Sequence, residues 1–405
     1  MGNSITIGIV AATGGRLGLD GGLNVYVRSL VEAVAQHGEH CRYVVLCGGE
    51  PDQDWREKTW PEHVSLAIMR EPRRGAYRLA RLTWVLMGAE KRGRWTSFDG
   101  YWRDLPFVEA VQREGIDAVH FPSTTMPVQW CPLPAGLTFF DMQHEYMPDL
   151  FSPKALASRR KAYRPSVERA SRVAASSEFT AGTLVEKYGL SRQGMDVIPV
   201  GIGAEYGERA RCSAAATRAK HGLSGTRYAI FPANPWPHKN HVRLLAALRV
   251  CRDTLGQTIN LVCTGRLQDQ VWSAEMLSTA AGVEGQVWDL GFLPAAEVSG
   301  LVAGAEFMVF PSLFEGFGIP LLEAMASGCP VCAADSTSIP ELLGGCGLLF
   351  DPLSVEAIAE AMVRMWTDSS LREGMRARGL ARSRLYGWDR VVPMLEEFYG
   401  RLVVS

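Results

Sequence analysis

Short apolar runs that alternate with helix-like stretches are the feature that most restricts the fold of this 405-residue chain. The first run, Ile5–Ala11, is rich in β-branched residues, and Gly14-Gly15 and Asp20-Gly21-Gly22 follow it. From Val25 to Val34, apolar side chains then recur at helical spacing, which predicts a strand, a glycine-rich loop and a helix. Further strand-like runs in this half are Tyr43–Cys47, Ala118–Phe121, Leu137–Phe140, Val173–Ala175 and Val197–Val200. Strands that alternate with helices predict the α/β class, with a parallel sheet covered on both faces.

The same alternation of strands and helices restarts after residues 201–225, where the pattern is weaker. The sequence therefore predicts two α/β domains of similar size. The second series of strands is predicted at Tyr228–Pro232, Ile259–Thr264, Gln286–Leu290, Phe307–Pro311 and Pro330–Ala333. The helices between and after them are predicted at His241–Cys251, Gln268–Ala281, Ala295–Ala303, Pro320–Ser327, Val355–Trp366 and Ser369–Leu385. Two such domains imply a ligand-binding cleft at the carboxyl ends of their strands.

Charge and cysteine content exclude several classes of protein. The formal net charge is −1, whereas a dedicated nucleic-acid binder carries a strong basic excess. Nine scattered cysteines, an odd number, argue against a secreted disulfide framework. Because no run of 18 apolar residues and no signal-peptide pattern occurs, we expect a cytoplasmic protein.

The segment from Phe310 to Met325 has the pattern of a phosphate-binding turn. A strand that ends at Pro311 leads into a loop with two glycines, and Pro320 suits the first turn of the next helix. Glycines allow the backbone to approach a ligand closely, and a helix N-terminus favours an anion such as a diphosphate. Glu315 and Glu323 flank this point, and carboxylates accept hydrogen bonds from sugar and ribose hydroxyls. The alternative is a solvated loop acid and a carboxylate that complements the helix dipole.

Glu315 and Glu323 are separated by seven residues within FPSLFEGFGIPLLEAMASGCPV, which resembles the E-x7-E signature of retaining glycosyltransferases of family 4. These enzymes have the GT-B fold, two Rossmann-like doubly wound domains that face a central cleft. Shorter stretches resemble the family elsewhere, namely 20–26, 141–148, 175–180, 198–202, 237–240 and 386–389. The resemblance implies a first, acceptor-binding domain over 1–204, a donor-binding domain over 205–385, and a terminal segment 386–405 that packs back on the first domain.

The resemblance also implies which residues bind a nucleotide-sugar donor. Glu323 would bind the ribose, Glu315 the donor sugar, and Lys239 the diphosphate, where its charge stabilises the departing leaving group. Many relatives have an arginine shortly before this lysine, but this chain does not. Arg266 is a candidate to supply that charge instead, and the alternative is that Arg266 is an ordinary surface residue. The remaining donor-binding candidates are Gly21, Gly22, Asn234, Phe317, Gly318 and Ile319.

A first-domain histidine completes the catalytic candidates, which are Glu315, Lys239 and His144. Relatives place a His-Asp pair near the donor sugar. In this chain that pair would fall on Phe140-Asp141, so His144 and Asp141 share the candidacy. A buried structural histidine is the alternative. Cys329 and Cys332 have metal-like spacing, but zinc needs four ligands and no second pair follows. The resemblance also implies catalysis without a metal, so we expect no metal and no cofactor apart from the nucleotide-sugar co-substrate.

The predicted function is transfer of a hexose, with retention of configuration, from a UDP- or GDP-sugar to an acceptor hydroxyl. GDP-mannose is one candidate donor. The acceptor class stays open between a sugar, a lipid-linked molecule and a small molecule, and the oligomeric state is also open. The alternatives are a non-catalytic cytosolic sugar-nucleotide-binding protein and a sugar-nucleotide epimerase of the same fold.

Residues 70–103 form a locally basic and aromatic segment, with nine Lys and Arg against three acidic residues. Three interpretations remain: a solvated helix face, a frame for the acceptor, and a patch that rests on the anionic inner surface of a membrane.

Overall fold

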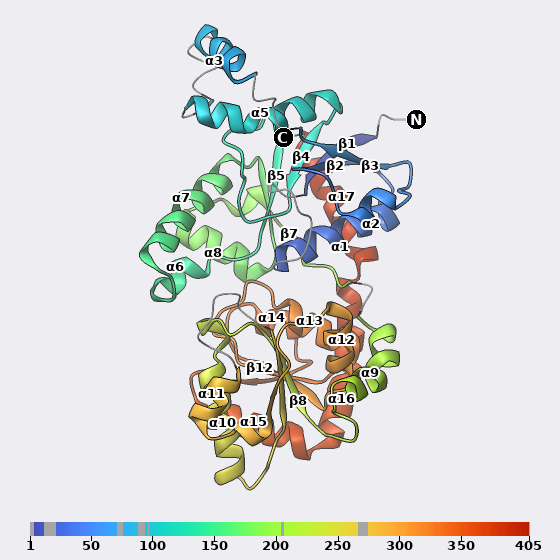
Figure 1. Cartoon of the computed structure of the whole chain (residues 1–405), viewed down its shortest axis with the longest axis vertical. Coiled ribbons are helices and arrows are strands. Elements are labelled where there is room, and N and C mark those ends of the chain that lie inside the picture. Colours follow the sequence, from blue (N-terminus) through green and yellow to red (C-terminus); the bar gives the residue numbers. More distant parts are fainter. Residues whose placement is uncertain are drawn as a thin grey trace.

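Two parallel sheets, each with helices on both faces, make up the chain (Figure 1). The computed structural model describes residues 4–11, 22–70, 76–87, 94–95, 97–203, 206–265 and 274–404. Gly21 and Arg266, both predicted at the donor site, lie outside these residues. The predicted α/β class and the two Rossmann-like domains are confirmed.

The first sheet has seven parallel strands in the order β3-β2-β1-β4-β5-β6-β7. Its strands are β1 Ile5–Val10, β2 Cys41–Cys47, β3 Val64–Ile68, β4 Ala118–Phe121, β5 Ala135–Phe139, β6 Arg172–Ala175 and β7 Met195–Val197. Its helices are α1 Gly22–His37, α2 Gln53–Glu57, α3 Ala76–Leu86, α5 Phe98–Arg113, α6 Gln143–Tyr146, α7 Pro153–Arg169 and α8 Glu178–Tyr188. The inner strands are buried on both faces, which is why they read as continuous apolar runs.

The second sheet has six parallel strands in the order β10-β9-β8-β11-β12-β13. Its strands are β8 Ala229–Pro232, β9 Leu261–Thr264, β10 Val287–Asp289, β11 Phe307–Phe310, β12 Val331–Ala334 and β13 Leu348–Phe350. The helices of this half are α9 Glu208–Lys220, α10 His241–Asp253, α11 Ala274–Ala281, α12 Ala295–Ala303, α13 Ile319–Ser327, α14 Ile339–Leu343, α15 Val355–Thr367 and α16 Ser369–Ser383. The predicted helix Gln268–Ala281 is described only from Ala274 onward.

The edge strands β3 and β13 are the strands that the sequence patterns did not indicate. Ser65 interrupts the apolar residues of β3, and β13 is only three residues long. A short or interrupted apolar run is a weak periodicity signal, so these two strands escape the prediction.

The chain crosses between the two domains at two neighbouring places. Ile202 donates its backbone N–H to the Tyr386 carbonyl at 2.9 Å, and Ile202 pairs with Gly387 as an isolated parallel bridge. Trp388 lies so close to Gly201 that a Cβ there would stand 2.2 Å from the indole ring. The two crossings are therefore packed against each other as one connection.

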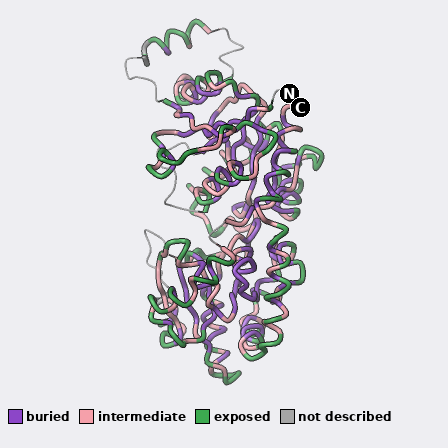
Figure 2. Tube along the Cα trace, turned by 90° about the vertical axis from the view of Figure 1, so that its right-hand side faces the viewer, coloured by how far each residue is buried: buried purple, intermediate pink, exposed green. Residues whose placement is uncertain are grey.

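The last helix, α17 (Trp388–Val404), packs on α1, β4 and β5 of the first domain. Its side chains Leu395, Phe398, Tyr399 and Leu402 are fully buried. Gly136 on β5 gives them room, since a Cβ at that position would stand 2.6 Å from the Phe398 ring. Figure 2 shows the resulting buried interior of both domains, with exposed residues on the outer helices.

A polar contact fixes α17 in place beside this apolar packing. One carboxylate oxygen of Glu396 accepts hydrogen bonds from the N–H groups of Glu39 and His40, at 3.1 and 2.9 Å, and from the Tyr43 hydroxyl at 2.8 Å. Glu396 and Tyr43 are both buried, so water does not readily replace the carboxylate at the Tyr43 hydroxyl.

In the part of the chain that the structure describes, no helix is both long enough and apolar enough to cross a bilayer. Each of the nine cysteines is free.

Replacement of Glu396 by alanine should lower the free energy of unfolding by about 2–4 kcal/mol, because it removes three hydrogen bonds and leaves the buried Tyr43 hydroxyl without this acceptor. Urea unfolding monitored by tryptophan fluorescence measures this loss. Glu397→Ala is the matched control, since Glu397 is exposed and makes only a surface pair with Arg401. Its effect should stay below about 0.5 kcal/mol. Equal losses in the two variants would contradict the role assigned to Glu396.

Candidate functional site

A cavity of about 510 Å³ lies between the two domains, at the carboxyl ends of their strands. Residues just beyond β5, β8, β9 and β11 line it, as open α/β sheets require of a ligand site. Among the predicted donor-binding residues, the cavity lining includes Gly22, Asn234, Lys239, Glu315, Phe317, Gly318, Ile319 and Glu323. The structure thus brings together every described member of that set.

Lys239 and Glu315 form an ion pair inside the cavity, with the Lys239 Nζ 2.6 Å from a Glu315 carboxylate oxygen. Their side chains are only 15% and 13% exposed, so water screens this pair weakly. The ammonium also lies 5.1 Å from the centre of the Phe310 ring. Lys239 sits on a short 3-10 turn, Pro237–Lys239, that follows β8.

Asn240 holds that turn in place. Its backbone is left-handed, with φ of 64°, a conformation that asparagine tolerates better than most residues. Its side-chain amide donates to the carbonyl of Pro311 at 3.1 Å and to that of Pro352 at 2.8 Å. Lys239 is therefore tied to the end of β11, the strand that leads to Glu315.

A second loop, residues 336–338, holds the backbone of Glu315 through two hydrogen bonds. The Glu315 N–H donates to the Thr337 hydroxyl at 3.1 Å, and the Ser338 hydroxyl donates to the Glu315 carbonyl at 2.9 Å. Thr337 also has a left-handed backbone, with φ of 54°. Sequence analysis did not identify these two residues, although a run of Ser and Thr after a strand is a signal for such a loop.

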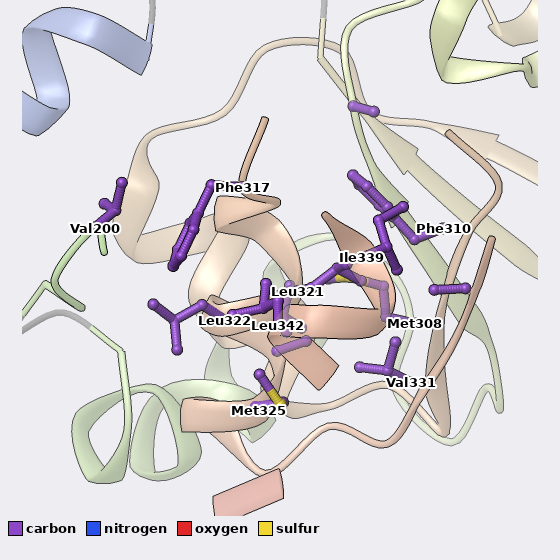
Figure 3. Packing of buried hydrophobic residues seen from close by; sticks show 14 of the residues in the cluster. Val200, Met308, Phe310, Phe317, Leu321, Leu322, Met325, Val331, Ile339 and Leu342 are labelled. Atoms are coloured by element: carbon purple, nitrogen blue, oxygen red, sulfur yellow. The ribbon is translucent and has the colours of Figure 1, made fainter. Parts of the chain in front are cut away.

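The N-terminal end of α13 is turned toward the cavity, because Gly318, Ile319 and Pro320 all line it. Gly318 precedes the helix with φ of 102°, a conformation that favours glycine. The floor beneath is a compact apolar layer (Figure 3). It is made by Leu321, Leu322 and Met325 of α13, with Ile339, Leu342, Met308, Phe310 and Val331 around them.

The loop that carries Glu315 is clamped onto the first domain through Gly316. The Gly316 carbonyl accepts from the hydroxyls of Ser177, Thr180 and Ser176, at 2.7, 2.9 and 3.2 Å. We call these three residues the hydroxyl clamp. On the same glycine, a Cβ would stand 1.8 Å from the Phe140 carbonyl oxygen. Only glycine allows this approach of the two domains.

Two further contacts extend the hydroxyl clamp along the domain boundary. The carboxylate of Glu341 accepts from the N–H groups of Glu178 and Phe179 at the start of α8, at 2.8 and 3.0 Å. The buried ring of Phe314 lies between Tyr146 and Phe179, with ring centres 5.5 and 5.7 Å away. The sequence of 175–180 resembles the family, but it predicts none of these contacts.

Of the two residues that shared the first-domain candidacy, Asp141 lines the cavity and His144 does not. Burial raises the pKa of Asp141, an effect that the Gln143 N–H and the Arg159 charge oppose. His144 is completely buried and packs edge-on against Tyr163, 4.6 Å between ring centres. Burial lowers its pKa to about 4, so its ring is neutral at pH 7.

Among the described residues, no three His, Cys, Asp or Glu side chains gather closely enough to hold a metal ion. Cys329 and Cys332 are buried thiols, and burial raises the pKa of Cys329 to about 12 and that of Cys332 well above its ordinary value. Both belong to the apolar core of the second domain.

Comparison with curated proteins finds bacterial mannosyltransferases. O-antigen chain mannosyltransferase B of Escherichia coli is 28% identical over 258 residues, which are 63% of this chain and 67% of that protein. The serotype-specific mannosyltransferase WbdA of Escherichia coli is 31% identical over 171 residues, 42% of this chain. That match spans only 21% of WbdA, about a fifth of its length.

Comparison with solved structures finds the same two-domain architecture. Sucrose-phosphate synthase from Thermosynechococcus elongatus superposes with a TM-score of 0.70 and 19% identity over 99% of both chains. Anabaena Alr3699/HepE in complex with UDP-glucose superposes with a TM-score of 0.67 and 17% identity, over 98% of this chain and 100% of that one. At these identities the likeness establishes the fold.

Two family models match nearly the whole chain between them. The model of Glycosyltransferase Family 4 matches residues 20–206, and that of Glycosyl transferases group 1 matches residues 214–382. Together with the mannosyltransferase relatives, they show that this chain belongs to the family 4 glycosyltransferases and has the GT-B fold.

Proposed function

We propose that the cavity binds a nucleoside diphosphate hexose and that the protein transfers the hexose to an acceptor hydroxyl. The observation that carries the proposal is the buried pair of Lys239 and Glu315 beside the N-terminal end of α13. Lys239 and the helix terminus offer positive charge to a diphosphate, while Glu315 and Glu323 offer acceptors to hydroxyl groups.

Donor binding exchanges one set of charge contacts for another. The diphosphate takes the Lys239 ammonium, and the hydroxyls of the hexose take the Glu315 carboxylate that the ammonium releases. Neither buried charge is then left without a partner, which avoids the main cost of breaking a buried ion pair. As the bond to the diphosphate breaks, Lys239 stabilises the negative charge that develops on the leaving group.

Mannose is the first hexose to test, because two relatives are mannosyltransferases. A solved neighbour was crystallised with UDP-glucose, so uridine donors are the comparison set. We also propose that transfer retains the anomeric configuration and needs no metal. Family membership supports both parts of this proposal. Lys239 supports the second part, because its positive charge can neutralise the diphosphate as a metal ion would. Asp141 faces the donor cavity from the acceptor domain and is a further candidate for contact with the reacting sugar.

Thermal unfolding with a panel of nucleotide sugars tests the donor class. GDP-mannose should raise the melting temperature most, because a ligand that binds only the folded state stabilises it, by about 2.7 kcal/mol at 100 times its Kd. Release of nucleoside diphosphate and the anomeric configuration of the product, followed by NMR, complete the test. The donor proposal is wrong if no nucleotide sugar shifts the transition.

Glu323→Gln should raise the Kd for the nucleoside diphosphate by about tenfold or more, because a charge-assisted hydrogen bond is lost. Glu315→Gln should lower kcat by about 10²-fold or more while the fold persists. Titration calorimetry and a transfer assay measure these effects. Glu360→Gln, an exposed position on α15, is the control and should change neither value. Unaltered binding and turnover in both site variants would refute the site.

Gly316→Ala should separate donor binding from transfer. The added methyl group meets the Phe140 carbonyl, so the domains cannot approach fully, although the second domain keeps its donor contacts. We expect a Kd within about twofold of the parent and a kcat lowered about 10²-fold, the cost of a misplacement near 1 Å. Gly182→Ala on α8, where a Cβ meets open space, is the control. Full turnover in Gly316→Ala would show that the contact is dispensable.

A further inference from the structure

Helix α3 stands at the end of the first domain farthest from the second domain, in both views of the molecule (Figures 1 and 2). One face of α3 packs on an aromatic cluster. Ala80 and Trp84 lie on that face, and the Tyr77 ring lies 5.0 Å from Phe98 and 5.2 Å from Trp102. These contacts hold the helix in place, so its other face has a fixed direction.

The outer face of α3 is apolar and exposed. Leu79, Leu82, Val85 and Leu86 are 67%, 55%, 60% and 75% exposed, and the three leucines follow the i, i+3, i+7 spacing of one helical stripe. A single exposed leucine is ordinary, but a continuous stripe on one helix marks a surface that is covered in use.

The sequence on both sides of this stripe is basic. The sequence from 70 to 94 carries eight Lys and Arg against two Glu, and α3 itself contains no acidic residue. Arg70 and Arg81 are exposed. Because the whole chain has a net charge of −1, this end is basic while the remainder is acidic. A complementary partner therefore has an anionic surface with an apolar layer below it.

The size of the face argues against a second copy of the chain or another protein as that partner. A helix of 11 residues is about 16 Å long and 10 Å wide, so its outer face offers on the order of 200 Å². Each partner in a stable protein pair buries about 800 Å². A lipid surface needs no matching groove, and aliphatic side chains beside arginines are the composition of an interfacial helix.

We propose that α3 docks the first domain onto an anionic phospholipid surface. Leu79, Leu82 and Leu86 enter the boundary between headgroups and acyl chains. The guanidinium groups of Arg70 and Arg81 pair with lipid phosphates. Since α3 lies at the far end of the first domain, the donor domain and the cavity stay outside this contact. Docking does not depend on the proposed function, and it is measured without substrate.

Sedimentation of the full-length protein with vesicles tests the proposal. The parent protein should bind vesicles of equal parts phosphatidylglycerol and phosphatidylcholine, and bind phosphatidylcholine alone at least about tenfold less. Raising the salt to about 1 M, where the Debye length is about 3 Å, should release the protein.

Two sets of variants separate the apolar and the charged contributions. The triple variant Leu79→Ser, Leu82→Ser and Leu86→Ser should lower the partition coefficient for vesicles at least about tenfold. The double variant Arg70→Gln and Arg81→Gln should abolish the preference for phosphatidylglycerol. Val242→Ser and Leu353→Ser, which replace aliphatic residues that are 67% and 63% exposed elsewhere, are the matched controls. They should bind like the parent.

Circular dichroism, melting temperature and light scattering complete the experiment. The triple serine variant should melt like the parent, since the replaced side chains are exposed. The proposal is overturned if the parent ignores phosphatidylglycerol or if the control variants lose binding equally. It is also overturned if the parent is an oligomer that the triple variant dissolves, because a second copy would then cover the stripe.

Discussion

The contact of Gly316 with the first domain is the constraint on which the rest of the site depends. Three hydroxyls hold its carbonyl, and the neighbouring backbone of Phe140 leaves no room for a side chain. Glu315 precedes this glycine and therefore faces a cavity whose opposite wall includes Asp141. A carboxylate from one domain and a carboxylate from the other thus meet around one space, although the sheets that carry them are separate.

Around that contact, hydrogen bonds hold the loops that carry Lys239 and Glu315. Asn240 joins the turn of Lys239 to the end of β11, and Thr337 with Ser338 holds both backbone groups of Glu315. Both Asn240 and Thr337 adopt left-handed backbone conformations. Strained positions of this kind persist where the surrounding structure holds them, and they concentrate at functional sites.

Sequence patterns predicted the fold class and most of the strands, and the family resemblance indicated residues that the structure places around one cavity, because each has a local signature. Strand β4 was predicted with the bounds it has, since burial on both faces produces an unbroken apolar run. Glu315 and Glu323 stand in one continuous motif. The hydroxyl clamp has no such signature, because Ser177 and Gly316 are 139 positions apart and both residue types are common in loops. The placement of His144 away from the cavity also depends on side-chain packing that no spacing rule contains.

The paired crossings near Ile202 and Gly387 determine how the two halves can move. Two backbone segments lie side by side there, joined by the hydrogen bond from Ile202 to Tyr386, and Trp388 packs against Gly201. Any rotation of one half against the other must therefore bend both segments at this connection. Lys239, Glu315 and Glu323 all lie in the second half of the chain, so such a rotation carries the three together and changes their distance from Asp141 across the cavity.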